Sequence, residues 1–149
     1  MTSSHAPGPL AGTLVVDLTR VLAGPFCTLV LAALGARGIK VEAPEGEDSR
    51  RIGPFIEGRS AYFLSLNRGK ESNALDLKEA AARAIFEKLL TRPDVLADNL
   101  RPGVMERLGP GWEALHERFP RLVKASTSGF VQTGPYARRP AYDLVAQAM

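Results

Sequence analysis

Apolar and polar positions in the first third of the chain follow the pattern of a strand, a helix and a second strand. Residues 13–18 form a short apolar run rich in β-branched side chains, and residues 25–34 are mostly small and apolar. Gly35 is placed to end a helix, and residues 38–42 form the next apolar run. This order predicts a βαβ unit with parallel strands and a right-handed crossover.

The middle of the chain continues the alternation after a polar interruption. Residues 43–59 are rich in Pro, Gly, Glu, Asp and Arg and predict a long surface loop. Residues 61–66 and 72–75 predict short extended segments, and Asp76 is expected to cap a helix over 78–90. The apolar stripe of that helix is expected to consist of Ala81, Ala82, Ile85, Phe86, Leu89 and Leu90.

The last third of the chain adds two more strands and two more helices to this pattern. Strands are predicted at 94–98 and 122–126, and helices at 104–108 and 112–119. The whole predicts one α/β arrangement around a parallel sheet. The loops after successive strands then gather along one edge, where open parallel sheets bind ligands.

The chain has the length and apolar content of one domain, although it need not be a complete domain. The 149 residues are 45% hydrophobic, which is enough to bury a sizeable core from residue 10 onward. Residues 1–9 have neither a basic start nor an apolar segment, and they predict a disordered lead rather than a signal peptide. The most apolar stretch, 21–34, is interrupted by Gly24 and Pro25 and is too short for a membrane span. A cytoplasmic location without membrane association is expected.

The number and placement of cysteine, histidine and arginine residues limit which ligands and reactions are expected. Cys27 is the only cysteine, which excludes an internal disulfide, and its apolar segment predicts a buried thiol. His5 and His116 form no metal-ligand cluster, so no metal is expected. The net charge is +3, without a dense basic stripe or interleaved aromatic residues, so nucleic acid is not an expected partner. Several arginines occur in loop-like places that suit a phosphate-bearing small molecule: Arg50, Arg51, Arg59, Arg68, Arg101, Arg138 and Arg139.

Three segments that follow predicted strands carry polar and flexible residues, at 19–25, 99–103 and 127–130. Gly24 and Pro25 at a helix entrance leave backbone N–H groups free for an anion. The amide of Asn99 and the guanidinium of Arg101 are donors suited to an acyl or phosphate oxygen. The alternative is that these segments are only well-formed turns.

Asp143 is the candidate reactive group. It lies between Tyr142 and the apolar residues 144–146, which predicts a partly buried position where poor solvation makes a carboxylate a better nucleophile or base. The alternative is structural: an aspartate here can cap the first turn of a short helix.

Taken together and in order, the motifs resemble those of the family III CoA-transferases, typified by formyl-CoA and carnitine CoA-transferases. The resemblance extends from residue 10 to residue 149, and motifs in register are far more specific than any single motif. The motifs are DLTRVLAGP at 17–25, LGA at 34–36 with IKVE at 39–42, NRGK at 67–70, DNLRPG at 98–103, SGF at 128–130, and GPY through YD at 134–143.

The resemblance implies a Rossmann-like parallel sheet with flanking helices, forming the N-terminal portion of the family's large domain. A small domain and the rest of the large domain come from later sequence, and two chains interlock as a homodimer. The substrates implied are an acyl-CoA and a small carboxylic acid. The family's acyl-accepting aspartate falls on Asp143. Its CoA-contacting positions fall on Val21, Leu22, Leu75, Lys78, Asn99, Leu100, Arg101 and Arg107.

In the mechanism implied, the Asp143 carboxylate attacks the thioester carbonyl and forms an acyl-aspartyl anhydride. The released CoA thiolate returns to give an aspartyl-CoA thioester, and an acceptor carboxylate completes the exchange. Both intermediates are activated acyl species, so excluding water is part of the function.

Departures from the family pattern bear on substrate and reaction. Related acyl-CoA racemases carry a histidine directly before the matching aspartate, whereas this chain has Tyr142, which favours a transferase over a racemase. Leu22 stands where formyl-CoA transferases have a glutamine, so the oxalate and formate pair is not supported. Val131 replaces a glycine and is expected to stiffen the segment after the last strand.

The family continues well beyond a length of 149 residues, with a glycine-rich loop and the small domain that cover the aspartate. The chain alone is therefore expected to be poorly active or inactive unless another polypeptide completes it. A truncated fragment that binds only CoA, or no ligand, is the non-enzyme alternative.

Overall fold

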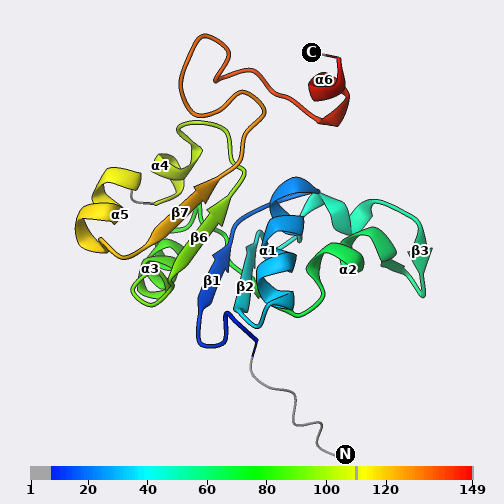
Figure 1. The fold of residues 1–149 in the computed structure, drawn as a ribbon, viewed down its shortest axis with the longest axis horizontal. Helices are drawn as coiled ribbons and strands as arrows, with labels where there is room; N and C mark the ends of the chain where they lie inside the picture. Colours follow the sequence, from blue (N-terminus) through cyan, green and yellow to red (C-terminus); the bar gives the residue numbers. More distant parts are fainter. Residues whose placement is uncertain (1–7, 110, 149) are drawn as a thin grey trace, which may run out of the picture.

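A five-stranded parallel sheet with helices on both faces forms the centre of the computed structural model, which describes residues 8–109 and 111–148 (Figure 1). The sheet strands are β1 (Leu14–Asp17), β2 (Arg37–Glu42), β5 (Lys70–Ala74), β6 (Val95–Asp98) and β7 (Val123–Ser126). Two short strands, β3 (Phe55–Ile56) and β4 (Arg59–Ser60), form a separate antiparallel pair. The helices are α1 (Ala23–Ala33), η1 (Asp48–Arg51, 3-10), α2 (Ala61–Asn67), α3 (Ala80–Leu89), α4 (Val104–Leu108), α5 (Trp112–Arg118) and α6 (Asp143–Gln147).

The strand order is β5-β2-β1-β6-β7, and every neighbouring pair in this sheet is parallel. From β1 the chain adds β2 and then β5 on one side. It then crosses to the other side of β1 to add β6 and β7. The direction of winding therefore reverses between β1 and β6, so the carboxyl ends of these two strands form the topological switch point, where open α/β sheets bind ligands in a crevice.

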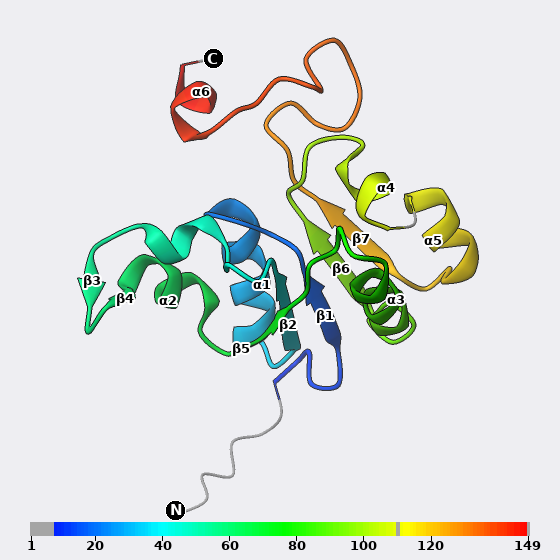
Figure 2. The same ribbon diagram turned by 180° about the vertical axis from the view of Figure 1, so that it is seen from behind.

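The two faces of the sheet are covered by different helices. α1 lies in front of the sheet in Figure 1, and α3 comes to the front when the molecule is turned around (Figure 2). Alternation along each strand sends Val16 toward the apolar core with Phe86 and Leu96, while Asp17 points to the opposite face. That core also contains Leu18, Val41, Leu77, Leu90, Met105, Leu115 and Leu122, from the strands, α4, α5 and the segments beside them.

The helix predicted at 78–90 forms two residues later than expected, as α3. The carboxylate of Asp76 accepts a hydrogen bond from Lys78 N at 3.0 Å, which makes a turn before the helix rather than its cap. Within the predicted stripe, Phe86 is fully buried, but Ile85 is 54% exposed. The buried face of α3 is thus narrower than the stripe read from the sequence.

The extended segment predicted at 61–66 is wrong, because these residues form α2. The hydroxyl of Ser60 accepts a hydrogen bond from Phe63 N at 3.0 Å, which caps the helix, and Phe63 and Leu66 are buried on one side of it. Two aromatic residues in the segment favour a strand by propensity, and capping with tertiary burial outweighs that preference.

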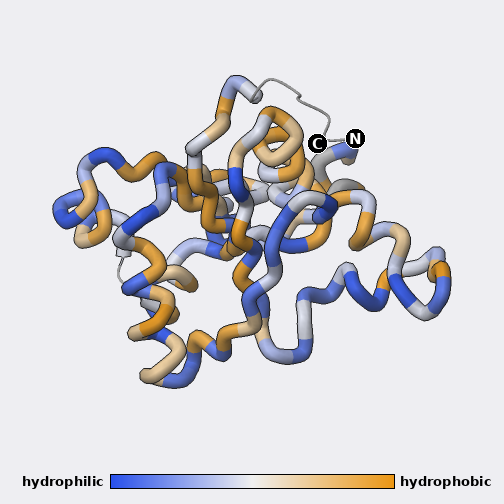
Figure 3. The backbone as a smooth tube through the Cα atoms, turned by 90° about the horizontal axis from the view of Figure 1, so that it is seen from below, coloured by the Kyte–Doolittle hydropathy of each residue, from blue (hydrophilic) through white to orange (hydrophobic). Residues whose placement is uncertain are grey.

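Two further expectations need correction. The predicted loop at 43–59 contains η1, β3 and the beginning of β4. Cys27 is exposed rather than buried, because it lies on the outer side of α1. Figure 3 shows hydrophobic and hydrophilic residues interleaved along the chain, and none of the described helices is long and apolar enough to cross a membrane.

The buried face of α3 predicts a sharp contrast between two neighbouring substitutions. Phe86→Ala should lower the free energy of unfolding by about 3–5 kcal/mol, because it leaves a cavity in the apolar core. Ile85→Ala on the same helix, at an exposed position, should cost less than about 1 kcal/mol. Urea denaturation followed by circular dichroism measures both, and equal losses would contradict this packing.

Candidate functional site

The carboxyl ends of the five parallel strands meet at one edge of the sheet, and the segment after β7 and α6 lie on that side (Figures 1 and 2). The residues expected from sequence distribute along this edge. Val21 and Leu22 follow β1, Leu75 and Lys78 follow β5, Asn99, Leu100 and Arg101 follow β6, and Arg107 lies on α4.

Asn99 joins the segments after β1 and β6 directly. Its Oδ1 accepts a hydrogen bond from Arg20 N at 2.8 Å, and its Nδ2 donates to Arg20 O at 2.7 Å. One side-chain amide thus satisfies both backbone groups of Arg20 across the switch-point crevice. The structure brings together Val21, Leu22 and Asn99 at this place, as the sequence predicted for loops on a common edge.

The turn after β1 is closely packed and strained. Val21 adopts a φ of 69°, a left-handed conformation that is costly for a β-branched residue. A Cβ on Gly24 would lie 2.4 Å from the Cβ of Thr19, so only glycine fits where α1 approaches the turn. Leu22, 46% exposed, stands between these two positions at the helix entrance.

Beneath this turn lies a buried charged cluster on the α1 face of the sheet. Asp17 Oδ1 accepts hydrogen bonds from Thr19 N at 2.7 Å and from Thr19 Oγ1. Its Oδ2 accepts from Thr28 Oγ1 at 2.6 Å and from Lys70 Nζ at 2.9 Å. Burial alone would raise the pKa of Asp17, but the charges of Lys40 and Lys70 and these hydrogen bonds outweigh it and hold that pKa below its usual value.

Lys70 and Lys40 occupy the same face from β5 and β2. Lys70 Nζ also donates to Pro25 O at 3.0 Å and to Asn67 Oδ1 at 2.9 Å, and burial lowers the pKa of this ammonium. Lys40 Nζ lies 2.8 Å from Glu47 Oε2 and donates to Thr19 O at 2.7 Å. Burial raises the pKa of Glu47.

A third ion pair closes the cluster near η1. The guanidinium of Arg50 donates to both oxygens of Glu42, at 2.6 and 2.7 Å, and Glu42 also accepts from Ser72 Oγ and from Glu47 N. Although burial opposes it, these bonds lower the pKa of Glu42 to about 2. This cluster was not predicted from the sequence. The available signal was the presence of charged residues, Asp17, Lys40 and Glu42, inside or at the end of apolar runs.

The remaining positions on the edge differ in character. Leu75 and Leu100 are half-buried and pack against the apolar core. The cationic residues Lys78, Arg101 and Arg107 are exposed, with Lys78 in the turn before α3 rather than on the helix. Among the residues that the structure describes, no three His, Cys, Asp or Glu side chains are grouped to hold a metal ion.

Asp143 begins α6, with Tyr142 as the residue before the first turn, so the expected helix cap is one residue earlier than Asp143. The side chain of Asp143 lies outside the described part of the structure. The expected partial burial of this segment is not found in its described neighbours: Tyr142 is 74% and Leu144 79% exposed. Nothing in the described surroundings therefore supplies the poor solvation that the sequence argument required.

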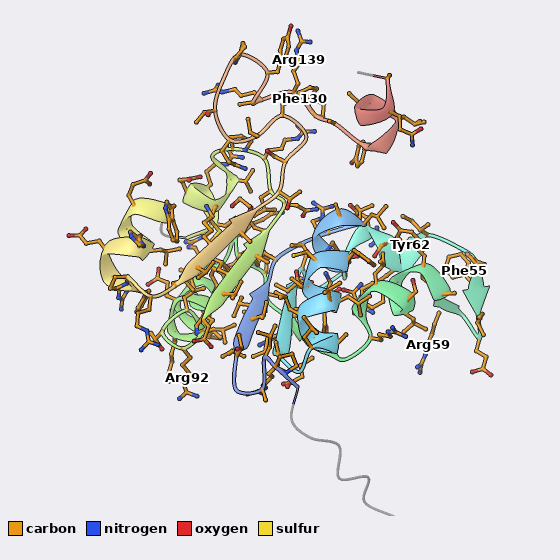
Figure 4. The ribbon with its side chains drawn as sticks, in the orientation of Figure 1. Phe55, Arg59, Tyr62, Arg92, Phe130 and Arg139 are labelled. Carbon is orange, nitrogen blue, oxygen red and sulfur yellow. The ribbon has the colours of Figure 1, made fainter. Side chains whose placement is uncertain are left out.

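A shallow cavity of about 480 Å³ lies between the segment after β7 and α6. It is lined by Phe130, Tyr136, Arg139, Pro140 and Val145, and the Arg139 guanidinium carbon lies 4.2 Å from the ring centre of Tyr136. Figure 4 shows Phe130 and Arg139 on this segment, away from the sheet. Val131, in the segment after β7, adopts a φ of 58°, which costs a β-branched residue about 1–2 kcal/mol.

Comparison with known proteins adds to this geometry. A family model described as CoA-transferase family III matches residues 10–149. The chain is 54% identical over 149 residues to an acetyl-CoA:oxalate CoA-transferase from Acetobacter aceti, covering 99% of this chain and 38% of the relative. It is 44% identical over 143 residues to a mouse (Mus musculus) succinyl-CoA:glutarate CoA-transferase, covering 95% of this chain and 33% of the relative.

A solved structure gives the same picture. The crystal structure of an aspartate-to-alanine mutant of Rv3272 from Mycobacterium tuberculosis matches with a TM-score of 0.89 at 41% identity, over 97% of this chain and 39% of that chain. This chain thus spans well under half the length of the relatives that it matches.

The Glu42–Arg50 pair predicts a specific acid sensitivity. The folded-state pKa of Glu42 lies below its ordinary value of 4.5, so its stabilisation is present above about pH 4.5 and is lost as the pH falls toward 2. Glu42→Gln should cost about 2 kcal/mol at pH 7 and progressively less below pH 4.5. Urea denaturation between pH 3 and 7 measures the difference.

The control for this prediction is Glu71→Gln, which breaks an exposed pair with Arg37 and should leave stability nearly unchanged at every pH. A difference between wild type and Glu42→Gln that stays constant over the pH range would contradict the assignment.

Proposed function

The chain belongs to CoA-transferase family III, and from that premise we propose that it moves CoA from an acyl-CoA donor to a carboxylic acid acceptor. The observation that carries the proposal is the bond pair between Asn99 and Arg20 at the switch point. It fixes the segments after β1 and β6 to each other, and the segments after β5 and β6 carry three exposed cationic side chains. A thioester with a phosphate-bearing carrier suits such an edge.

Binding of CoA is proposed to use the eight positions along the edge in different ways. Val21 and Leu22 offer backbone groups and an apolar side chain at the helix entrance. The guanidinium groups of Arg101 and Arg107 and the ammonium of Lys78 would pair with phosphates. Leu75, Asn99 and Leu100 would shape the crevice, since two of them pack on the core and one bridges the turns.

The acceptor is proposed to be a small dicarboxylic acid. The two curated relatives named above act, by name, on oxalate and glutarate, with acetyl-CoA and succinyl-CoA as donors. Oxalate is therefore one of the acceptor acids to test, although Leu22 stands where formyl-CoA transferases have a glutamine. Both relatives are transferases, and Tyr142 removes the second base that a racemase of this kind requires.

The proposed chemistry proceeds through a carboxylate of the enzyme. Its oxygen attacks the thioester carbonyl carbon, the C–S bond breaks, and the CoA thiolate leaves with the electron pair. The thiolate then attacks the enzyme's carbonyl carbon in the anhydride and releases the donor acid, leaving an enzyme-CoA thioester. The acceptor carboxylate then attacks the carbonyl carbon of the enzyme-CoA thioester and releases the CoA thiolate. That thiolate attacks the acceptor's carbonyl carbon in the new anhydride, which gives the new acyl-CoA and frees the enzyme's carboxylate.

Within this sequence, Asp143 is the proposed carboxylate. The alternative is a carboxylate outside these 149 residues, which the exposure of the residues beside Asp143 favours. An interlocked homodimer with a small domain, in the cytoplasm, is likewise proposed for the complete protein.

The proposed covalent chemistry predicts a trappable adduct. The chain is incubated with acetyl-CoA or succinyl-CoA, with oxalate or glutarate, and trapped with hydroxylamine or borohydride before intact-mass and peptide-mass analysis. An adduct on Asp143 that is absent from Asp143→Asn supports this residue as the nucleophile. An adduct on another carboxylate, in this chain or in a longer protein that contains it, assigns the nucleophile elsewhere. Absence of CoA transfer under every condition contradicts the activity.

The bridge between the two turns predicts a binding defect. Asn99→Ala removes both bonds to Arg20 and should weaken CoA binding about 10-fold, equivalent to about 1.4 kcal/mol. Isothermal titration calorimetry with CoA measures the dissociation constant. Asn73→Ala, at an exposed asparagine on β5, is the matched control and should bind within about twofold of wild type. Equal affinities for the two variants would rule out this role for Asn99.

A further inference from the structure

Lys40 is a buried ammonium whose contacts serve the turn after β1. Its side chain is 2% exposed, and its Nζ lies between Glu47 Oε2 at 2.8 Å and Thr19 O at 2.7 Å. Lys40 is the charge partner of Glu47 Oε2, and no hydrogen bond from another described residue reaches that oxygen. The lysine therefore links the segment after β2 to the carbonyl that opens the turn.

Burying a lysine ammonium here costs more free energy than burying an apolar side chain, so packing alone does not explain the residue. An ammonium taken out of water must recover its lost hydration from partners, and apolar residues of similar volume often replace a buried ion pair without loss of stability. What an apolar side chain could not supply is a donor for the Thr19 carbonyl. The chemistry of the position thus points to the orientation of that carbonyl.

The next two residues of the turn show why that orientation matters. Arg20 is held at both backbone groups by Asn99, and Val21 follows at a φ of 69°. A β-branched residue stays in this conformation only where its neighbours enforce it. The peptide between Thr19 and Arg20 is fixed on one side by Lys40 and on the other by Asn99, so these two side chains together constrain Val21.

We propose that Lys40 is a positioning residue for the CoA-binding turn, holding the Thr19 carbonyl so that Val21 and Leu22 face the crevice between β1 and β6. The inference rests on the proposed function for the identity of the ligand. It goes beyond that function in assigning the shape of the turn to a residue that lies beneath it on another strand.

Three variants and a matched control test this inference. Lys40→Met with Glu47→Leu removes the pair together and leaves no orphaned buried charge, so the fold is expected to persist. Lys40→Arg retains a charged donor toward the Thr19 carbonyl. Lys40→Met alone is compared with them for stability. Arg37→Met, on the same strand, breaks an exposed ion pair with Glu71 and is the control.

Two readouts separate this inference from the proposed function. Without ligand, the backbone amide chemical shifts and hydrogen-exchange protection of Arg20, Val21 and Leu22 report the turn. With CoA, isothermal titration calorimetry reports the dissociation constant, and thermal melting reports stability. The double variant should perturb the turn amides and weaken CoA binding at least about 10-fold while remaining folded. Lys40→Arg should stay within about threefold, and Arg37→Met should resemble wild type.

Each outcome decides the matter. Unchanged turn amides in the folded double variant would overturn the positioning role, whatever the affinity for CoA. Perturbed amides with unchanged CoA affinity would also overturn it, because the turn would then not govern binding. If the wild-type chain binds no CoA, the proposed ligand fails for this chain, and the turn amides alone decide whether Lys40 shapes the turn.

Discussion

The buried ion pair between Asp17 and Lys70 is the interaction on which the rest of this fold depends. The ammonium reaches across from edge strand β5 to central strand β1 and also contacts a carbonyl of α1 and a side chain of α2. Four elements therefore converge on two opposite charges, each almost fully buried. Removing either charge would leave the other buried without a partner, which is among the costliest changes a protein interior can undergo.

The two faces of the sheet contribute to the fold in different ways, one through apolar burial and the other through directional bonds. The α3 face is apolar and closes around Phe86, so it supplies non-directional burial energy. The α1 face carries Asp17, Lys40, Glu42 and Lys70, whose bonds have fixed directions and rigidify their surroundings when fully satisfied. The turn after β1 is held by the α1 face, so the backbone of residues 19–21 is positioned by these directional interactions.

Alternation of apolar runs predicted the parallel sheet because buried strands and amphipathic helices differ in period, which is a local property. Residues 61–66 form a helix in place of the expected extended segment, because Ser60 caps that helix and its burial depends on distant elements. Asp17 at the end of an apolar run indicates that a partner is needed, but no local pattern identifies that partner as Lys70, which lies 53 residues away. The positions around the crevice followed from the rule for parallel sheets, whereas the surroundings of Asp143 depend on contacts that a linear pattern does not encode.

The side-chain amide of Asn99 takes the place of a peptide group, continuing the hydrogen bonding between β1 and β6 beyond the point where the strands end. The segments on either side of this bridge have almost no freedom to change in length, since one inserted residue would carry Arg20 or Asn99 out of register. The connection from β2 to β5 is also tied to the turn after β1 near η1, where Asp48 pairs with Arg20 and Glu47 pairs with Lys40. Variation in loop length among proteins of this architecture should therefore accumulate farther along that connection, at the largely exposed β3–β4 hairpin, leaving the turn after β1 unaltered.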